Sequence, residues 1–239
     1  LLTLNWKRFL PNTIFICPNA HEKCSINPSG YQWFDLSNDD PHYILKESLK
    51  AEKILNKYIN EIKDELKISN SEICLSGFSQ GCMMAINLGL TSYEKYNCII
   101  GFSGKIIDHK NLSKRITSKT NTLLIHGDSD QIVSPTNLLT SKDFFLRHKI
   151  NIETEMINNC ELFFQNDIKR SQKYSSRTRE EIITDRWIIY KQNDPSFDNV
   201  MQWFKSENIS LYSSYPPTNQ FLIDSHLNFP KKRKIALFL

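Results

Sequence analysis

Short apolar runs recur along the first two-thirds of the chain, and each is bounded by proline, glycine or polar residues. Apolar runs of about four to eight residues are typical of strands that are buried on both faces of a parallel sheet. We therefore predict strands at residues 12–19, 72–78, 97–104, 121–130 and 151–158.

Between these runs, apolar residues recur at three- and four-residue spacing, which is the period of an amphipathic helix. Asp40-Pro41 predicts a helix start, with Asp as the N-cap and Pro in the first turn, and the pattern continues to about residue 67. Residues 80–90 and 134–149 are two further predicted helices. Because strands and helices alternate, we predict an α/β fold with a mostly parallel sheet and helices on both faces.

The alternation ends near Cys160. Beyond it, residues 185–191 predict an isolated strand and residues 194–204 an isolated helix. No glycine follows Gly127, although roughly eight would be expected there at the usual frequency of about 7%. We therefore divide the chain into a first domain, residues 1–160, and a tail of unknown character, residues 161–239.

Composition narrows the class of protein. The chain has 239 residues, of which 40% are hydrophobic and 23% charged, as in ordinary globular proteins. Its formal net charge of +4 is too small to indicate a nucleic-acid partner. The dense basic run at 231–234 could bind a polyanion, but we favour a solvated segment.

The cysteines and the first residues of the sequence indicate the cellular compartment in which we expect the protein. Six cysteines form no Cys-x-x-Cys pair and none lies near a histidine at zinc spacing, so we expect no metal site and a reduced, cytoplasmic environment. No apolar stretch reaches the roughly 18 residues that would span a membrane. The first residues lack both a signal-peptide pattern and an initiator Met, and we expect the domain to be truncated at its N-terminus.

The sequence "GFSQG" at 77–81 joins the predicted strand 72–78 to the predicted helix 80–90. Gly-x-Ser-x-Gly at such a junction is the nucleophile elbow, which presents its serine at the carboxyl edge of the sheet. Ser79 is therefore a candidate nucleophile, and the backbone N–H of Gln80 a candidate oxyanion donor. The alternative is a glycine-rich turn with an idle serine, which the strand–turn–helix context disfavours.

An acidic residue should follow the serine in the chain, on a later strand end. The sequence "HGDSDQIV" supplies Asp128 and Asp130 in the acidic loop that ends the segment 121–130, just past the strand residues 122–126. Either carboxylate could instead be a turn residue or a helix N-cap, and Asp128 suits that structural role better.

Several ordered motifs, "WFDL", "LSGFSQGCMMA", "GFSG" and "LLIHGDSDQIV", resemble the phospholipase/carboxylesterase family over about residues 10–160. That family includes bacterial serine carboxylesterases and acyl-protein thioesterases, all of them α/β-hydrolases. The resemblance implies that Ser79 is the nucleophile, that Asp130 rather than Asp128 orients the catalytic histidine, and that the N–H of Gln80 binds the oxyanion. It implies no catalytic role for His126, no metal or organic cofactor, and a small acyl ester or thioester as substrate.

Two family features are missing from the motif pattern. No His-Gly-x-Gly loop precedes Asn12, and no histidine follows the predicted strand 151–158 where the family has its catalytic one. His148 falls on a predicted helix, which leaves His226 in the tail as the remaining candidate. A change of reading frame or a gene fusion near Cys160 would explain both the missing histidine and the unfamiliar tail.

Two functions follow from these observations. The first is a serine hydrolase of the carboxylesterase or thioesterase type that cleaves short acyl esters. The second is a catalytically inactive hydrolase remnant without turnover. A dienelactone hydrolase or peptidase relative is a third interpretation, and "GFSQG" favours the esterase over it.

Overall fold

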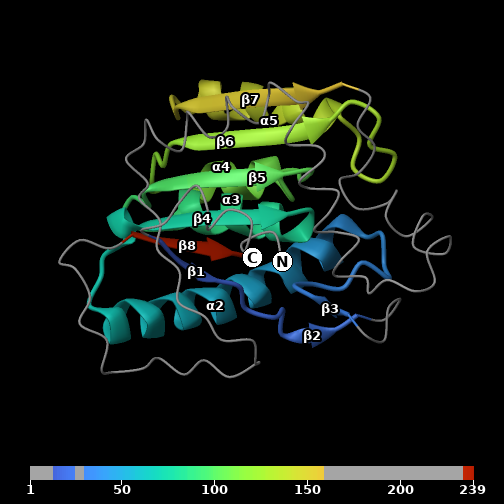
Figure 1. The fold of residues 1–239 in the computed structure, drawn as a ribbon. Helices are drawn as coiled ribbons and strands as arrows, with labels where there is room; N and C mark the ends of the chain where they lie inside the picture. The colour runs from blue at the N-terminus through green and yellow to red at the C-terminus, as the bar shows by residue number, and fades with distance from the viewer. Residues whose placement is uncertain (1–12, 25–29, 159–233) are drawn as a thin grey trace, which may run out of the picture.

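The computed structural model describes residues 13–24, 30–158 and 234–239 (Figure 1). A six-stranded sheet with the order β1-β8-β4-β5-β6-β7 forms its centre, and every neighbouring pair is parallel. Its strands are β1 (Thr13–Ile16), β4 (Ile73–Phe78), β5 (Cys98–Phe102), β6 (Thr122–Gly127), β7 (Ile152–Ile157) and β8 (Lys234–Phe238). The predicted α/β class and the mostly parallel sheet are confirmed, and the five predicted strands all lie in this sheet.

A second, two-stranded sheet pairs β2 (Glu22–Lys23) with β3 (Tyr31–Gln32) in antiparallel fashion. The sequence did not predict it, because two residues are too few to show the alternation of a strand. This small sheet supports the loop that carries the "WFDL" sequence, next to the carboxyl end of β1.

The helices are α2 (Pro41–Leu66), α3 (Gln80–Thr91), α4 (His109–Arg115) and α5 (Thr136–Arg147), with a short 3-10 helix η1 (Asn70–Glu72) before β4. Asp40 caps α2 as predicted, since its carboxylate accepts a hydrogen bond from the N–H of His42 at 3.1 Å. Lys67 ends the helix in the left-handed conformation at φ 54°. The sequence missed α4, which is too short to display an apolar period.

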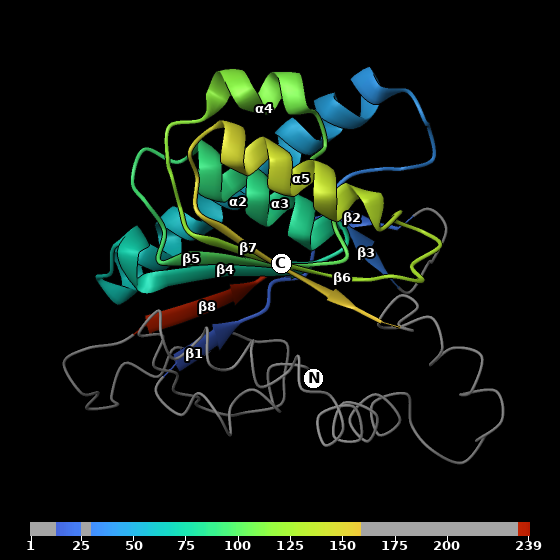
Figure 2. The same ribbon diagram turned by 90° about the horizontal axis from the view of Figure 1, so that it is seen from above.

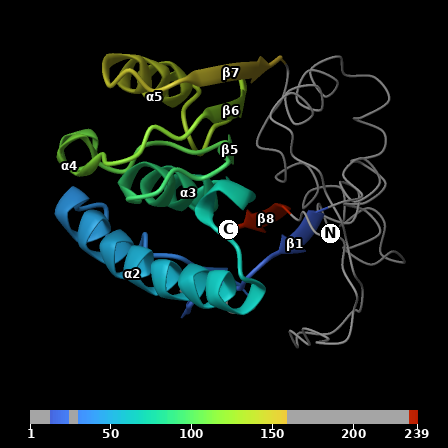
Figure 3. The same cartoon turned by 90° about the vertical axis from the view of Figure 1, so that its left-hand side faces the viewer.

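The described helices lie together on one face of the sheet (Figures 2 and 3). Helix α3 packs against β4 and β5, α5 packs against β7, and α2 and α4 pack on α3. The sequence predicted helices on both faces, and within residues 13–24, 30–158 and 234–239 no helix lies on the second face.

Helix α3 is buried along its length, from Gly81 to Leu90. Sheet, α2 and α4 surround it, which explains why its sequence is apolar on all sides rather than on one stripe. The residue before this helix is Ser79, so the candidate nucleophile is anchored to the most buried element of the described core.

Strand β8 is the main departure from the sequence prediction. It lies inside the sheet between the edge strand β1 and β4, and Ile235 pairs with both Ile14 of β1 and Ile73 of β4 (Figure 1). The sequence assigned residues 161–239 to a separate tail, but residues 234–238 are a strand of the main sheet.

This strand escaped prediction for a physical reason. Its short apolar run follows a basic run, and its partners are far away in the sequence, so no local periodicity marks it. The predicted strand 185–191, the predicted helix 194–204 and His226 lie outside the described residues.

Candidate active site

Ser79 occupies a sharp turn between β4 and α3. Its backbone has φ 52° and ψ −113°, a positive φ that non-glycine residues rarely adopt. The turn is held on both sides: the Ser79 N–H donates to the carbonyl of Phe102 at 2.9 Å, and its carbonyl accepts from the N–H of Met83 at 3.1 Å. Backbone strain of this kind costs about 1–3 kcal/mol and is concentrated at functional sites.

Both glycines of the motif are required by close packing. A Cβ at Gly77 would lie under 3.0 Å from the backbone of Gly81, and a Cβ at Gly81 would lie under 3.0 Å from the carbonyl of Leu239. Gly77 thus allows strand and helix to meet at the turn. Gly81 allows the end of β8 to approach the first turn of α3.

Gln80 is the first residue of α3. The N–H groups of a first helical turn have no acceptor within the helix, and the helix dipole makes this end favourable for negative charge. The Gln80 side chain forms two hydrogen bonds that the sequence did not predict. Its Oε1 accepts a hydrogen bond from the N–H of Trp33 at 3.0 Å, and its Nε2 donates one to the carbonyl of Phe34 at 2.8 Å.

An open cleft of about 420 Å³ lies beside Ser79. Polar and apolar surface contribute about equally to its wall, and the residues that line it come from the loop after β1, from β3 and the loop after it, from the turn and from the end of β8: Pro18, Asn19, Ala20, Tyr31, Trp33, Phe78, Ser79, Gln80, Gly81 and Leu239. Only Ser79 and Gln80 had been singled out from the sequence. The "WFDL" motif is the signal that could have pointed to Trp33.

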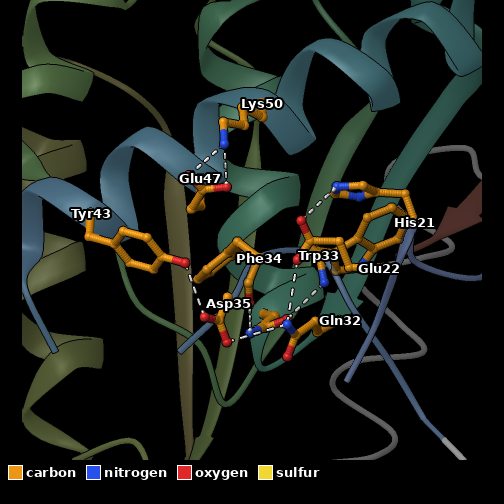
Figure 4. A network of polar contacts seen from close by, with 10 residues as sticks. His21, Glu22, Gln32, Trp33, Phe34, Asp35, Tyr43, Glu47 and Lys50 are labelled. Atoms are coloured by element: carbon orange, nitrogen blue, oxygen red, sulfur yellow. Dashed lines mark hydrogen bonds and ion pairs between the residues drawn. The ribbon is translucent and has the colours of Figure 1, made fainter. Parts of the chain in front are cut away.

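A polar network holds the loop that carries Trp33 (Figure 4). Gln32 lies within 3.4 Å of Glu22 and 3.5 Å of Asp35, and the Asp35 carboxylate accepts hydrogen bonds from the side chain and backbone of Ser37 and from the Tyr43 hydroxyl. The hydrogen bonds from Ser37 lower the pKa of Asp35 to about 2, so this carboxylate stays ionised and ties the loop to α2.

Asp130 is buried just after β6, with 4% of its surface exposed. Its Oδ1 accepts hydrogen bonds from the N–H groups of Ile132 and Val133, both at 2.9 Å. Its Oδ2 is buried too, and among the described residues it has no hydrogen-bond partner. Asp128 is exposed and accepts from the Ser129 hydroxyl at 2.8 Å, which agrees with its predicted role as a turn residue.

His126 is buried beside Asp130, but its side chain forms its hydrogen bond with another residue, Val133. Its Nε2 lies 2.7 Å from the carbonyl of Val133 and 3.4 Å from Asp130 Oδ2. Because a carbonyl only accepts, Nε2 must carry the proton and direct it to Val133. His126 therefore fixes the loop 127–133 and leaves Oδ2 without a hydrogen bond.

In the described part of the chain, no histidine donates to Asp130 Oδ2; these histidines are His21, His42, His109, His126 and His148. His109 and His148 both contact the ring of Phe144, with centroid distances of 5.3 and 4.5 Å. Partial burial, with a smaller effect from Arg147, lowers the pKa of His109. The two side chains belong to the packing between α4 and α5.

With this geometry in view, the sequence can be compared with known proteins. The sequence profile of the phospholipase/carboxylesterase family matches residues 1–161. The chain belongs to this family. The match confirms the family that the motifs predicted, and it begins at residue 1 rather than at about residue 10.

Similar family members include acyl-protein thioesterases. The chain is 31% identical to acyl-protein thioesterase 1 of Gibberella zeae over 145 residues, which cover 54% of this chain and 62% of that protein. For acyl-protein thioesterase 1 of Saccharomyces cerevisiae the identity is 30% over 145 residues, covering 56% and 63%. For acyl-protein thioesterase 1 homolog 1 of Dictyostelium discoideum it is 28% over 130 residues, covering 50% and 56%. The chain thus spans less than two thirds of each relative.

Solved structures confirm the α/β-hydrolase fold of this family member. The crystal structure of esterase PE8 superposes with a TM-score of 0.60 at 25% identity, over 70% of this chain and 92% of that one. The structure of Zea mays acyl-protein thioesterase 2 superposes with a TM-score of 0.51 at 15% identity, over 83% and 94%, and supports the fold alone.

Two further properties of the described residues bear on the site. Across these segments, every helix is too short or too polar to cross a bilayer. Within the same ranges, no cluster of three or more His, Cys, Asp or Glu side chains could bind a metal ion.

Proposed function

We propose that this family member is a serine hydrolase of the carboxylesterase or thioesterase type, which cleaves short acyl esters or thioesters with Ser79 as its nucleophile. The observation that carries the proposal is the strained backbone of Ser79, at the start of α3 and beside an open cleft that Trp33 and Tyr31 help to line. The names of its relatives, esterase and acyl-protein thioesterase, agree with an acyl substrate.

In the proposed mechanism, Ser79 Oγ attacks the acyl carbon while a histidine removes the hydroxyl proton. The carbonyl oxygen becomes an oxyanion that accepts a hydrogen bond from the backbone N–H of Gln80. The bond to the leaving alcohol or thiol then breaks, and the histidine returns the proton to that group. Water attacks the acyl-Ser79 ester in the same way and releases the carboxylic acid.

Asp130 is proposed to orient this histidine. Leaving a buried acceptor unpaired costs about 1–3 kcal/mol, so the free Oδ2 of Asp130 favours a donor that reaches it. An imidazole N–H would satisfy it and would be held in the tautomer that the reaction needs. Of the six histidines in the sequence, His226 is the one outside the described residues, and we propose it for this role.

An inactive hydrolase scaffold is the second candidate. The free Oδ2 of Asp130 favours it as well, because a site that lost its histidine would keep this acceptor unpaired. A cytoplasmic location stays a prediction, as does the separate character of those residues beyond 160 that the structure does not describe.

Hydrolysis of a short chromogenic ester, such as p-nitrophenyl acetate, separates the two candidates. We expect turnover by the full chain that is lost in Ser79→Ala and strongly reduced in His226→Ala. Equal release of nitrophenol by the full chain and by Ser79→Ala would support the inactive scaffold.

A further inference from the structure

The Gln80 side chain joins the turn that carries Ser79 to the wall of the cleft. Its amide forms two hydrogen bonds with consecutive residues of the loop after β3, one with the N–H of Trp33 and one with the carbonyl of Phe34. These residues are 46 and 47 positions away in the sequence. We infer that this side chain is a positioning group, which sets the distance between Ser79 and the Trp33 wall and thereby determines which acyl chains fit. The inference rests on the proposed function.

Both hydrogen bonds require a primary amide at this position. Oε1 must accept and Nε2 must donate, and glutamine offers both from one planar group. A glutamate would still accept from Trp33, but its ionised second oxygen would face the Phe34 carbonyl, which also only accepts. A leucine of similar size would form neither bond.

The rest of the loop makes this contact effective. Phe34 is buried in the core with 1% exposed, and Asp35 is tied to Ser37 and to Tyr43 of α2 (Figure 4). Trp33, 6% exposed, directly precedes these anchors and lines the cleft. The loop is therefore fixed to α2 on one side, and Gln80 fixes it to the start of α3 on the other.

The consequence for the reaction is a change in selectivity. Trp33 and Tyr31 form apolar surface beside Ser79, and apolar surface binds an acyl chain in proportion to the area that it covers. Release of the loop should weaken the binding of a long acyl chain more than that of an acetyl group, which is too short to cover the same wall.

The first test measures the contact itself and needs no turnover. Amide hydrogen exchange at the Trp33 N–H is compared in the full chain, Gln80→Leu and Gln80→Glu. Gln80→Leu should raise the exchange rate on the order of tenfold at every pH, the effect of losing one hydrogen bond. Gln80→Glu should raise it at about pH 8, and the rate should recover towards about pH 4, below the ordinary glutamate pKa of about 4.3, because a protonated carboxyl can donate to Phe34.

Ratios to the full chain at the same pH cancel any effect of the other ionisable groups beside the loop, which are His21, Glu22 and Asp35. Unchanged exchange at Trp33 in both variants would overturn the inference. An equal rise in Gln80→Glu at both pH values would overturn it too, since a merely destabilised fold has no reason to recover on protonation of residue 80.

The second test measures kcat and KM for p-nitrophenyl acetate and octanoate. Gln80→Leu should raise KM for octanoate on the order of tenfold more than KM for acetate. The control is Trp33→Ala, which removes the wall but keeps the backbone N–H that Gln80 holds. In this variant KM for octanoate should rise relative to KM for acetate, while the backbone N–H of residue 33 should exchange as slowly as in the full chain.

Equal losses for both esters in Gln80→Leu would contradict the selectivity role. If the full chain shows no Ser79-dependent turnover, the proposed function has failed, and the exchange experiment alone decides whether Gln80 positions the loop.

Discussion

The main-chain carbonyl of Leu239 lies against Gly81, so closely that a Cβ on Gly81 would come within 3.0 Å of it. The N–H of Leu239 donates to the carbonyl of Ser76 at 2.7 Å, which fixes the end of β8 beside the end of β4. Two segments that are far apart in the sequence therefore meet beside Ser79. The last strand is part of the wall of the candidate site, and the site depends on it.

Disruption of β8 should therefore damage the whole sheet. Ala236 is 2% exposed and pairs with Phe15 and Cys74 on either side. Ala236→Pro removes an N–H from a central strand, and we expect a loss of about 3 kcal/mol in the free energy of unfolding, with aggregation through the exposed edges. Urea unfolding measures the loss. Tyr93→Ala, at a position that is 95% exposed, is the control and should unfold like the full chain.

Asp130→Asn tests the carboxylate without removing the turn. The asparagine oxygen can still accept from the N–H groups of Ile132 and Val133, so the fold should be kept. Its amide would present a donor instead of an acceptor to the histidine, and we expect kcat to fall about 10⁴-fold, as when a triad histidine is held in the wrong tautomer. Ester hydrolysis measures the fall in kcat, and thermal unfolding checks that the variant is folded. Wild-type turnover in this variant would exclude Asp130 from the mechanism.

His109 should make a pH-dependent contribution to the free energy of unfolding. Partial burial lowers its pKa from the ordinary value of 6.5, so the unfolded chain binds the proton more tightly than the folded chain. This contribution is fully present above the unfolded-state pKa, declines as the pH falls through 6.5, and is lost below the folded-state pKa. The Tm of the full chain should thus fall more between about pH 7 and pH 5 than the Tm of His109→Gln. Parallel Tm curves for the two proteins would show that His109 makes no such contribution.

Local patterns in the sequence were enough to predict most of the sheet. The strands around Ser79 are apolar runs between turn residues, Asp40-Pro41 marks the start of α2, and the glycines on both sides of Ser79 indicate the sharp turn. These features depend on neighbours within a few residues, so the chain itself displays them.

Contacts between distant segments could not be predicted in this way. Strand β8 has no periodicity that distinguishes it from a tail, and its place follows from pairing with β1 and β4. The cleft wall at Trp33 depends on the hydrogen bonds from Gln80, whose sequence motif points to its backbone rather than its side chain. That Asp130 Oδ2 accepts no hydrogen bond from the described residues is visible only once the burial of that carboxylate is known.

The most direct measurement of the central claim is covalent labelling of the full chain with a fluorophosphonate probe, followed by mass spectrometry of its peptides. An activated serine attacks phosphorus, expels fluoride and keeps the phosphonyl group. We expect a single phosphonyl group on the peptide that contains Ser79, and none on that peptide in Ser79→Ala. An unlabelled Ser79 peptide in the folded full chain would contradict the assignment of Ser79 as the nucleophile.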